Sequence, residues 1–148
     1  KFPKISIYDY NGNIVDLNVF KGKIIVFDLW TSTCSKCIEE FPKFETLTRE
    51  FSNDDNIVFI NLNIPLEHDG IEVISKHTNN FTFKKFRGDD KTEKQLGIYA
   101  YPQYIIIDKD FRIKHVGSLN VDRRLFYNNF YKIIKDINEH KINFDYLN

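Results

Sequence analysis

The two cysteines of the chain, Cys34 and Cys37, lie between an apolar run and a helical pattern, and this arrangement limits the folds open to the sequence. The run from Ile24 to Trp30 is rich in β-branched and aromatic residues, as expected of a strand buried on both faces of a sheet. From Ser35 to about Phe51, apolar residues recur at steps of three and four, which predicts a helix with one buried face. Cys34 is therefore expected at the N-terminus of that helix.

This position favours redox chemistry at Cys34. The free backbone N–H groups and the positive end of the helix dipole stabilise an anion there. Free cysteine titrates near ~8.5, whereas C-x-x-C thiols at helix starts are lowered to roughly 3.5–7.5. Lys36 adds a positive charge beside the motif. We expect Cys34 to be the nucleophile, and Cys37, one turn further into the helix, to be the more buried thiol that resolves a mixed disulfide.

Two other uses of a cysteine pair fit the sequence less well. A zinc site would need two further ligands, and the histidines do not show paired ligand spacing; they are His68, His77, His115 and His140. A purely structural disulfide across so short a loop would constrain the unfolded chain little. We therefore expect no metal and no other cofactor.

The composition sets the remaining limits. The chain has 148 residues, 42% of them apolar, and carries equal numbers of acidic and basic residues, 21 of each. This predicts one globular domain over residues 1–148 and gives no electrostatic case for binding nucleic acid or a membrane surface. No apolar run approaches the ~20 residues of a spanning helix. Because the sequence starts at Lys1 and has no methionine, we expect it to be a segment excised from a longer or membrane-anchored chain.

The other elements are predicted from apolar periodicity and turn residues. They are an N-terminal hairpin (Ile5–Tyr8 and Ile14–Leu17, around Asn11-Gly12-Asn13), a buried strand Ile57–Ile64, a short helix around Ile71–His77, a short helix Glu93–Gly97, a hairpin (Tyr104–Asp108 and Arg112–Val116) and a C-terminal helix over Leu125–Ile137 with Asp122 as N-cap. Phe81–Arg87 fits either an edge strand or a loop. Pro42 should kink its helix. The order βαβ then ββα predicts an α/β fold with one mixed sheet and helices on both faces.

The sequence resembles the thioredoxin fold and, within it, the TlpA/ResA/DsbE-like thiol-disulfide oxidoreductases. Three segments carry the resemblance, which covers Ile5 to about Ile137: Lys21-Gly22-Lys23 before the central strand, Phe27 to Pro42, and Leu96 to Asp108. A lone C-x-x-C is a weak signal. Its combination with Trp30 upstream, Glu40 and Pro42 downstream, and Pro102 at the start of a later strand is specific.

The resemblance implies further site residues. It implies that Tyr101–Pro102 is a cis peptide bond facing the cysteines, presenting the backbone of Tyr101 to an extended substrate. Together with Tyr101 and Pro102, Trp30 and Lys36 are expected to contact the substrate.

The resemblance also places two acids beneath the motif. Asp28 occupies the position of the buried acid of thioredoxins, and Glu40 that of the acid of ResA-like proteins. Either carboxylate, its pKa raised by burial, could accept the proton of Cys37, and we favour Glu40. Glu39 is expected to be a solvated charge.

Three residues depart from the family pattern. Thr33 stands where a second tryptophan is usual, Lys36 replaces the usual proline inside the motif, and Phe111 replaces a turn glycine. The first two changes should alter thiolate stability and thus the reduction potential, in a direction that the sequence leaves open. The third suggests a different hairpin shape.

Three functions compete on these grounds. The first is a thiol-disulfide oxidoreductase, for which the resemblance implies an extracytoplasmic reductant, a monomer that acts on protein disulfides or thiols and draws electrons from a membrane or soluble thiol donor. The second is a thiol peroxidase, because Thr31-x-x-Cys34 resembles the peroxiredoxin T-x-x-C, although the preceding proline is missing. The third is a non-enzymatic binding or redox-sensing module, which Tyr99 and Tyr101 would suit, while Tyr104 is expected to pack in the core.

Overall fold

The computed structural model describes residues 1–119 and 123–147, with side chains for 1–119 and 124–139. Its elements, in chain order, are β1 (Ile7–Tyr8), β2 (Ile14–Val15), the 3-10 helix η1 (Leu17–Phe20), β3 (Ile24–Trp30), α1 (Ser35–Glu50), β4 (Ile57–Asn63), α2 (Ile71–Thr78), β5 (Lys84–Arg87), α3 (Thr92–Leu96), β6 (Gln103–Ile107), β7 (Ile113–Gly117) and α4 (Arg123–Leu147).

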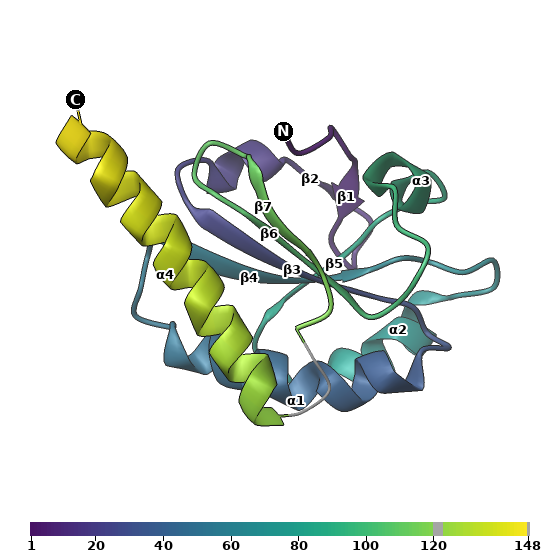
Figure 1. Cartoon of the computed structure of the whole chain (residues 1–148). Helices are drawn as coiled ribbons and strands as arrows, with labels where there is room; N and C mark the ends of the chain where they lie inside the picture. Colours follow the sequence, from purple (N-terminus) through teal and green to yellow (C-terminus); the bar gives the residue numbers. More distant parts are fainter. Residues whose placement is uncertain (120–122, 148) are drawn as a thin grey trace.

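The strands form one mixed sheet in the order β2-β1-β5-β4-β3-β6-β7, in which β3 is an interior strand (Figure 1). β3 pairs in parallel with β4 on one side and antiparallel with β6 on the other. The parallel β3–β4 pair is joined through α1, as a βαβ crossover requires. This is the predicted thioredoxin-like α/β fold.

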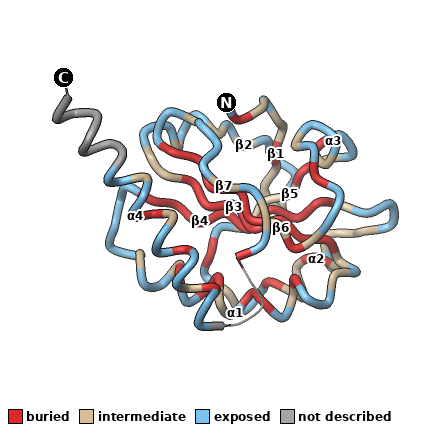
Figure 2. The backbone as a smooth tube through the Cα atoms, in the orientation of Figure 1, coloured by how far each residue is buried: buried red, intermediate tan, exposed pale blue. Residues whose placement is uncertain are grey.

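Both faces of the sheet are covered, which accounts for the continuous apolar strands (Figure 2). Side chains of β3 alternate between two apolar clusters. Val26 and Trp30 pack in the cluster formed with α1, α2 and α4. Ile25, Phe27 and Leu29 pack in a second cluster with the N-terminal segment, η1 and the residues around α3. Asp28, between Phe27 and Leu29, therefore lies on the α1 face by strand alternation.

The predicted elements are found, although several of their bounds differ. The N-terminal hairpin is present, but its strands have two residues each. The segment Phe81–Arg87, which fitted a strand or a loop, is a loop through Phe83 followed by β5. This strand is interior to the sheet, because β4 pairs with one side of it and β1 with the other. The N-cap predicted at Asp122 lies outside the described residues. Phe111 adopts a positive φ of 62° in the β6–β7 turn, where the usual glycine would be unstrained.

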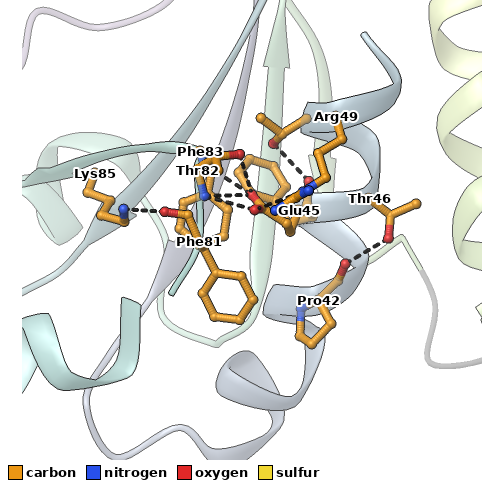
Figure 3. A network of polar contacts seen from close by, with 10 residues as sticks. Pro42, Glu45, Thr46, Arg49, Phe81, Thr82, Phe83 and Lys85 are labelled. Atoms are coloured by element: carbon orange, nitrogen blue, oxygen red, sulfur yellow. Dashed lines mark hydrogen bonds and ion pairs between the residues drawn. The ribbon is translucent and has the colours of Figure 1, made fainter. Parts of the chain in front are cut away.

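Helix α1 continues through Pro42, and a buried carboxylate anchors its second half. Figure 3 shows Glu45 facing the loop before β5. The Glu45 carboxylate accepts from the backbone N–H of Thr82 at 2.8 and 2.9 Å and of Phe83 at 3.2 Å. Arg49, one turn later, donates to the same carboxylate at 3.2 Å. A buried carboxylate needs hydrogen-bond donors of this kind to offset its loss of hydration. In return, these hydrogen bonds fix α1 to the loop before β5.

We expect Glu45→Ala to lower the free energy of unfolding by about 3 kcal/mol, because two backbone N–H groups of the loop would lose a charged acceptor. The exposed Glu39 of the same helix provides the control, and Glu39→Ala should change stability by less than about 0.5 kcal/mol. Urea denaturation followed by circular dichroism measures both. Equal effects of the two substitutions would show that the Glu45 contacts do not hold the helix.

Candidate active site

The two cysteines form a disulfide at the N-terminus of α1, with their Cα atoms 5.3 Å apart. Cys34 is the N-cap residue of the helix, with extended backbone, and Cys37 lies in its first turn. Cys34 is half-buried, whereas Cys37 is only 1% exposed. The two sulfurs therefore differ in access, and a partner arriving from solvent meets Cys34.

The helix start surrounds the Cys34 sulfur with positive potential. The backbone N–H of Cys37 donates to Cys34 Sγ at 3.1 Å. The first turn of α1 holds no acidic residue. In the dithiol state, the same N–H and the helix dipole would stabilise a Cys34 thiolate.

The Tyr101–Pro102 peptide bond is cis, as expected. The β3–β6 register pairs Leu29 with Gln103, so Pro102 lies at the end of the sheet where β3 leads into the cysteine loop. Pro102 is buried and Tyr101 is half-buried. The Tyr101 hydroxyl donates to Glu93 Oε2 at 2.7 Å, which turns this ring toward α3. Burial and the Glu93 carboxylate both raise the pKa of Tyr101.

The other two residues expected to contact a substrate differ in exposure. Lys36 is exposed beside the cysteines. Trp30 is completely buried, its ring edge-on to Phe41 at a centroid distance of 5.0 Å. Its indole Nε1 donates to Asn61 Oδ1 at 2.6 Å. The structure therefore does not support direct substrate contact by Trp30, because the side chain forms part of the core under the site.

Asp28 lies on β3 beneath the helix and has no exposed surface. Asn61 of β4 is its register partner and donates through Nδ2 to Asp28 Oδ2 at 3.2 Å. Burial raises the pKa of Asp28 well above its ordinary value, the charge of Glu40 raises it further, and the Asn61 hydrogen bond opposes both. Asp28 is thus a group that binds a proton tightly.

Glu40 is the second buried acid, 3% exposed, and lies three residues after Cys37 on the buried face of α1. The Tyr104 hydroxyl donates to Glu40 Oε1 at 2.9 Å. Burial raises the pKa of Glu40, while the Tyr104 hydrogen bond and the charges of Lys43 and Lys36 lower it. The structure therefore brings both predicted acids together within one buried polar group.

Three residues of this region were not predicted as site residues. Asn61 and Tyr104 connect the two acids to Trp30 and to β6. A sequence signal exists for Asn61, an amide in an otherwise apolar strand. The third is Asp69, in the loop after β4, whose Oδ1 accepts from Ser32 Oγ at 2.8 Å and whose backbone carbonyl accepts from Arg87. It ties this loop to the segment before Cys34, and no sequence pattern points to it.

Over the side chains that the structure describes, no group of three or more histidines, cysteines or acids is placed to hold a metal ion. None of the helices searched within the described residues is long and apolar enough to cross a membrane.

Comparisons with known proteins agree with this geometry. The thiol:disulfide interchange protein DsbE of Vibrio cholerae is 25% identical over 112 residues, covering 74% of this chain and 58% of the relative. The thiol-disulfide oxidoreductase ResA of Bacillus anthracis is 25% identical over 115 residues, covering 75% of this chain and 64% of the relative. This chain thus spans less than two thirds of either relative.

A solved structure of a thiol:disulfide interchange protein from Bacteroides sp. shares the fold, with a TM-score of 0.70 and 21% identity over 90% of this chain and 86% of that one. The family model described as Redoxin matches residues 1–132, which include the cysteine pair, both acids and the cis proline. The chain belongs to the Redoxin family.

Proposed function

We propose that this protein is a thiol-disulfide oxidoreductase that works through Cys34 and Cys37. The observation that carries the proposal is the disulfide across the first turn of α1, with one accessible and one buried sulfur. A pair with this asymmetry suits attack by one thiol and resolution by the other. The relatives named as DsbE and ResA support the same activity.

In the reductive direction, the Cys34 thiolate attacks one sulfur of a substrate disulfide. A bond forms between Cys34 Sγ and that sulfur, and the other substrate sulfur leaves as a thiolate. Cys37 then loses its proton and attacks Cys34 Sγ, which releases the second substrate thiolate. The substrate gains two electrons, and the protein is left with the Cys34–Cys37 disulfide.

The buried acids serve the second step of this reaction, in which Cys37 loses its proton and attacks Cys34. Cys37 and Glu40 are three residues apart on one face of α1, and a carboxylate on that face can accept the Cys37 proton. We favour Glu40 as the acceptor over Asp28. We assign the substrate contact to the exposed Lys36, the half-buried Tyr101 and the backbone at Pro102, while Trp30 supports the site from the core.

We further propose the reductive direction and an extracytoplasmic location, with protein disulfides as substrates and a membrane or soluble thiol protein as electron donor. The names DsbE and ResA of the relatives support this assignment. The single pair of cysteines leaves no other thiol to mispair in an oxidising compartment. A monomer suffices, because one chain supplies every residue of the proposed site.

Insulin reduction in the presence of dithiothreitol tests the activity. We expect Cys34→Ala to abolish turnover, because the attacking sulfur is lost, and Cys37→Ala to accumulate a mixed disulfide on Cys34 that mass spectrometry detects. Ser35→Ala, inside the motif, is the control and should retain turnover. Absence of both turnover and trapped adduct would refute the oxidoreductase. Rapid peroxide consumption with sulfenic acid on Cys34 would indicate a peroxidase instead.

The reduction potential tests the direction. Because the Glu40 carboxylate, one turn beyond Cys37, opposes the thiolate stabilisation by the helix, we expect a potential nearer thioredoxin's ~−270 mV than DsbA's ~−120 mV. Equilibration of the pair with defined glutathione or dithiothreitol buffers measures it. A potential at the DsbA end of this range would assign an oxidant.

The pH dependence of stability tests the buried acid Asp28. The folded state holds the Asp28 proton at pH values where the unfolded chain has lost it, because burial raises the pKa from its ordinary value of 3.8. This advantage is complete below about pH 4 and is lost as the pH rises through the raised pKa. Over that range, the unfolding free energy of the wild type should therefore fall more steeply than that of Asp28→Asn.

Urea denaturation of the oxidised protein from about pH 4 to about pH 9 provides the measurement, with the exposed Asp55→Asn as control. The control should follow the wild-type curve. Parallel curves for wild type and Asp28→Asn would contradict the expected burial effect.

A further inference from the structure

A row of polar side chains crosses the sheet beneath α1. Tyr104 of β6 is the register partner of Asp28 of β3, and Asp28 is the register partner of Asn61 of β4. Paired residues on neighbouring strands point to the same face, so all three side chains face α1, from which Glu40 descends. All four residues are at least 97% buried, as their exposures of 0 and 3% show.

We propose that Tyr104 is a positioning residue whose hydroxyl makes Glu40 the ionised carboxyl of this buried pair, while Asp28 keeps its proton. The proposal rests on the proposed function, because an ionised Glu40 is the form that can accept the proton of Cys37 when Cys37 resolves the mixed disulfide. The assignment of charge itself is a property of the oxidised protein and does not depend on turnover.

The first step concerns Asp28, whose surroundings supply a single neutral donor. The indole N–H of Trp30 can only donate, so it takes the amide oxygen of Asn61 and turns the amide nitrogen toward Asp28. Asp28 Oδ2 accepts this hydrogen bond. Among the described residues, Asp28 Oδ1 has no hydrogen-bond partner, so this oxygen is the one left to carry a proton.

The second step concerns Glu40, where burial raises the pKa but the neighbouring hydroxyl and lysines stabilise the anion, a support that Asp28 lacks. Tyr104 donates to Oε1 at 2.9 Å, and the positive charges of Lys43 and Lys36 act on the carboxyl group from the same helix. Glu39 opposes them more weakly. The pKa of Tyr104 is raised well above its ordinary value by burial and by the two acids, so its hydroxyl stays protonated and remains a donor.

Among the side chains that the structure describes, Glu40 is the charged group that acts on Asp28. Lys85 of β5 is in register with Asn61, but its ammonium group donates to the Phe81 carbonyl. From α2, the His77 ring packs edge-on against Trp30 at a centroid distance of 6.0 Å. From α4, the Phe126 ring packs edge-on against Tyr104 at 5.5 Å.

The third step follows from the coupling between the acids. The charge of Glu40 raises the pKa of Asp28, so once Glu40 is ionised a second charge beside it is disfavoured in this buried site. The hydroxyl and the two lysines assign the first charge to Glu40. Among the described residues, Glu40 Oε2 has no hydrogen-bond partner, which leaves it able to accept a proton from the Cys37 thiol. The transfer gives a Cys37 thiolate and a neutral Glu40.

Carboxyl carbon NMR titration of the oxidised wild-type protein is the primary test, because the two midpoints are measured on the unaltered site and variants serve only to assign the signals. We expect the Glu40 signal to titrate at lower pH than the Asp28 signal, with assignments from Glu40→Gln and Asp28→Asn. An Asp28 signal that titrates at lower pH than the Glu40 signal would overturn the proposal. This result is independent of insulin reduction, so it can fail while the oxidoreductase assignment stands, and the reverse also holds.

Tyr104→Phe tests the hydroxyl, since it keeps the ring between its aromatic neighbours. We expect the Glu40 midpoint to rise by about one pH unit, the scale of one lost hydrogen bond to a carboxylate, and the Asp28 midpoint to fall. The matched control is Tyr10→Phe, which removes a partly buried hydroxyl that contacts Thr78 in the same apolar cluster. It should leave both midpoints unchanged. An unchanged Glu40 midpoint in Tyr104→Phe would refute the role of the hydroxyl.

The pH profile of substrate release from the Cys34 mixed disulfide provides a functional readout that a loss of packing would not shift. Tyr104→Phe should raise the midpoint of this pH profile by about one pH unit, the same shift that is expected for the Glu40 midpoint. In a Glu40→Gln background, Tyr104→Phe should cause no further shift. A shift that persists in the Glu40→Gln background would show that Tyr104 acts by another route.

Discussion

The structure depends on the enclosure of β3, which is hydrogen-bonded along both edges and covered on both faces. A strand in this position is shielded from water along nearly its whole length, and six of its seven residues are buried. For the apolar residues this enclosure is the main stabilising contribution to the fold. For Asp28 it means that the charge state is determined by the side chains of β4, β6 and α1 rather than by solvent.

Helix α1 joins the accessible chemistry to this buried group. Its N-terminus presents the Cys34 sulfur, its first turn buries Cys37, and the next turn delivers Glu40 to the polar row. Two turns after Cys37, Glu45 attaches the same helix to the loop before β5. Because one continuous helix carries all these residues, the distance between the thiols and the acid is fixed by helical geometry rather than by loop packing.

The sequence predicts much of this arrangement because periodic burial leaves a periodic pattern. The bounds of β3 agree with the apolar run, and the cysteines lie at the helix start that the change in period indicates. The segment Phe81–Arg87 was ambiguous because its aromatic residues do not alternate, and only pairing with β1 and β4 makes its last four residues the strand β5. Trp30 was expected to contact the substrate, whereas the structure shows it completely buried on the α1 face of the sheet, where strand alternation places it. The contacts of Tyr104 and Asp69 depend on register and loop packing, which residue spacing does not encode.

The N-terminal hairpin has a consequence for the association of chains. β1 meets β5 through a single register pair, Tyr8 with Arg87, and the sheet then ends at β2. Without this extension, the outer side of β5 would present unpaired backbone groups to any passing strand, a template for edge-to-edge assembly. The hairpin replaces that edge with a strand of two residues, Ile14 and Val15. A strand so short offers little backbone for another chain to pair with, so a few N-terminal residues protect the sheet from aggregation.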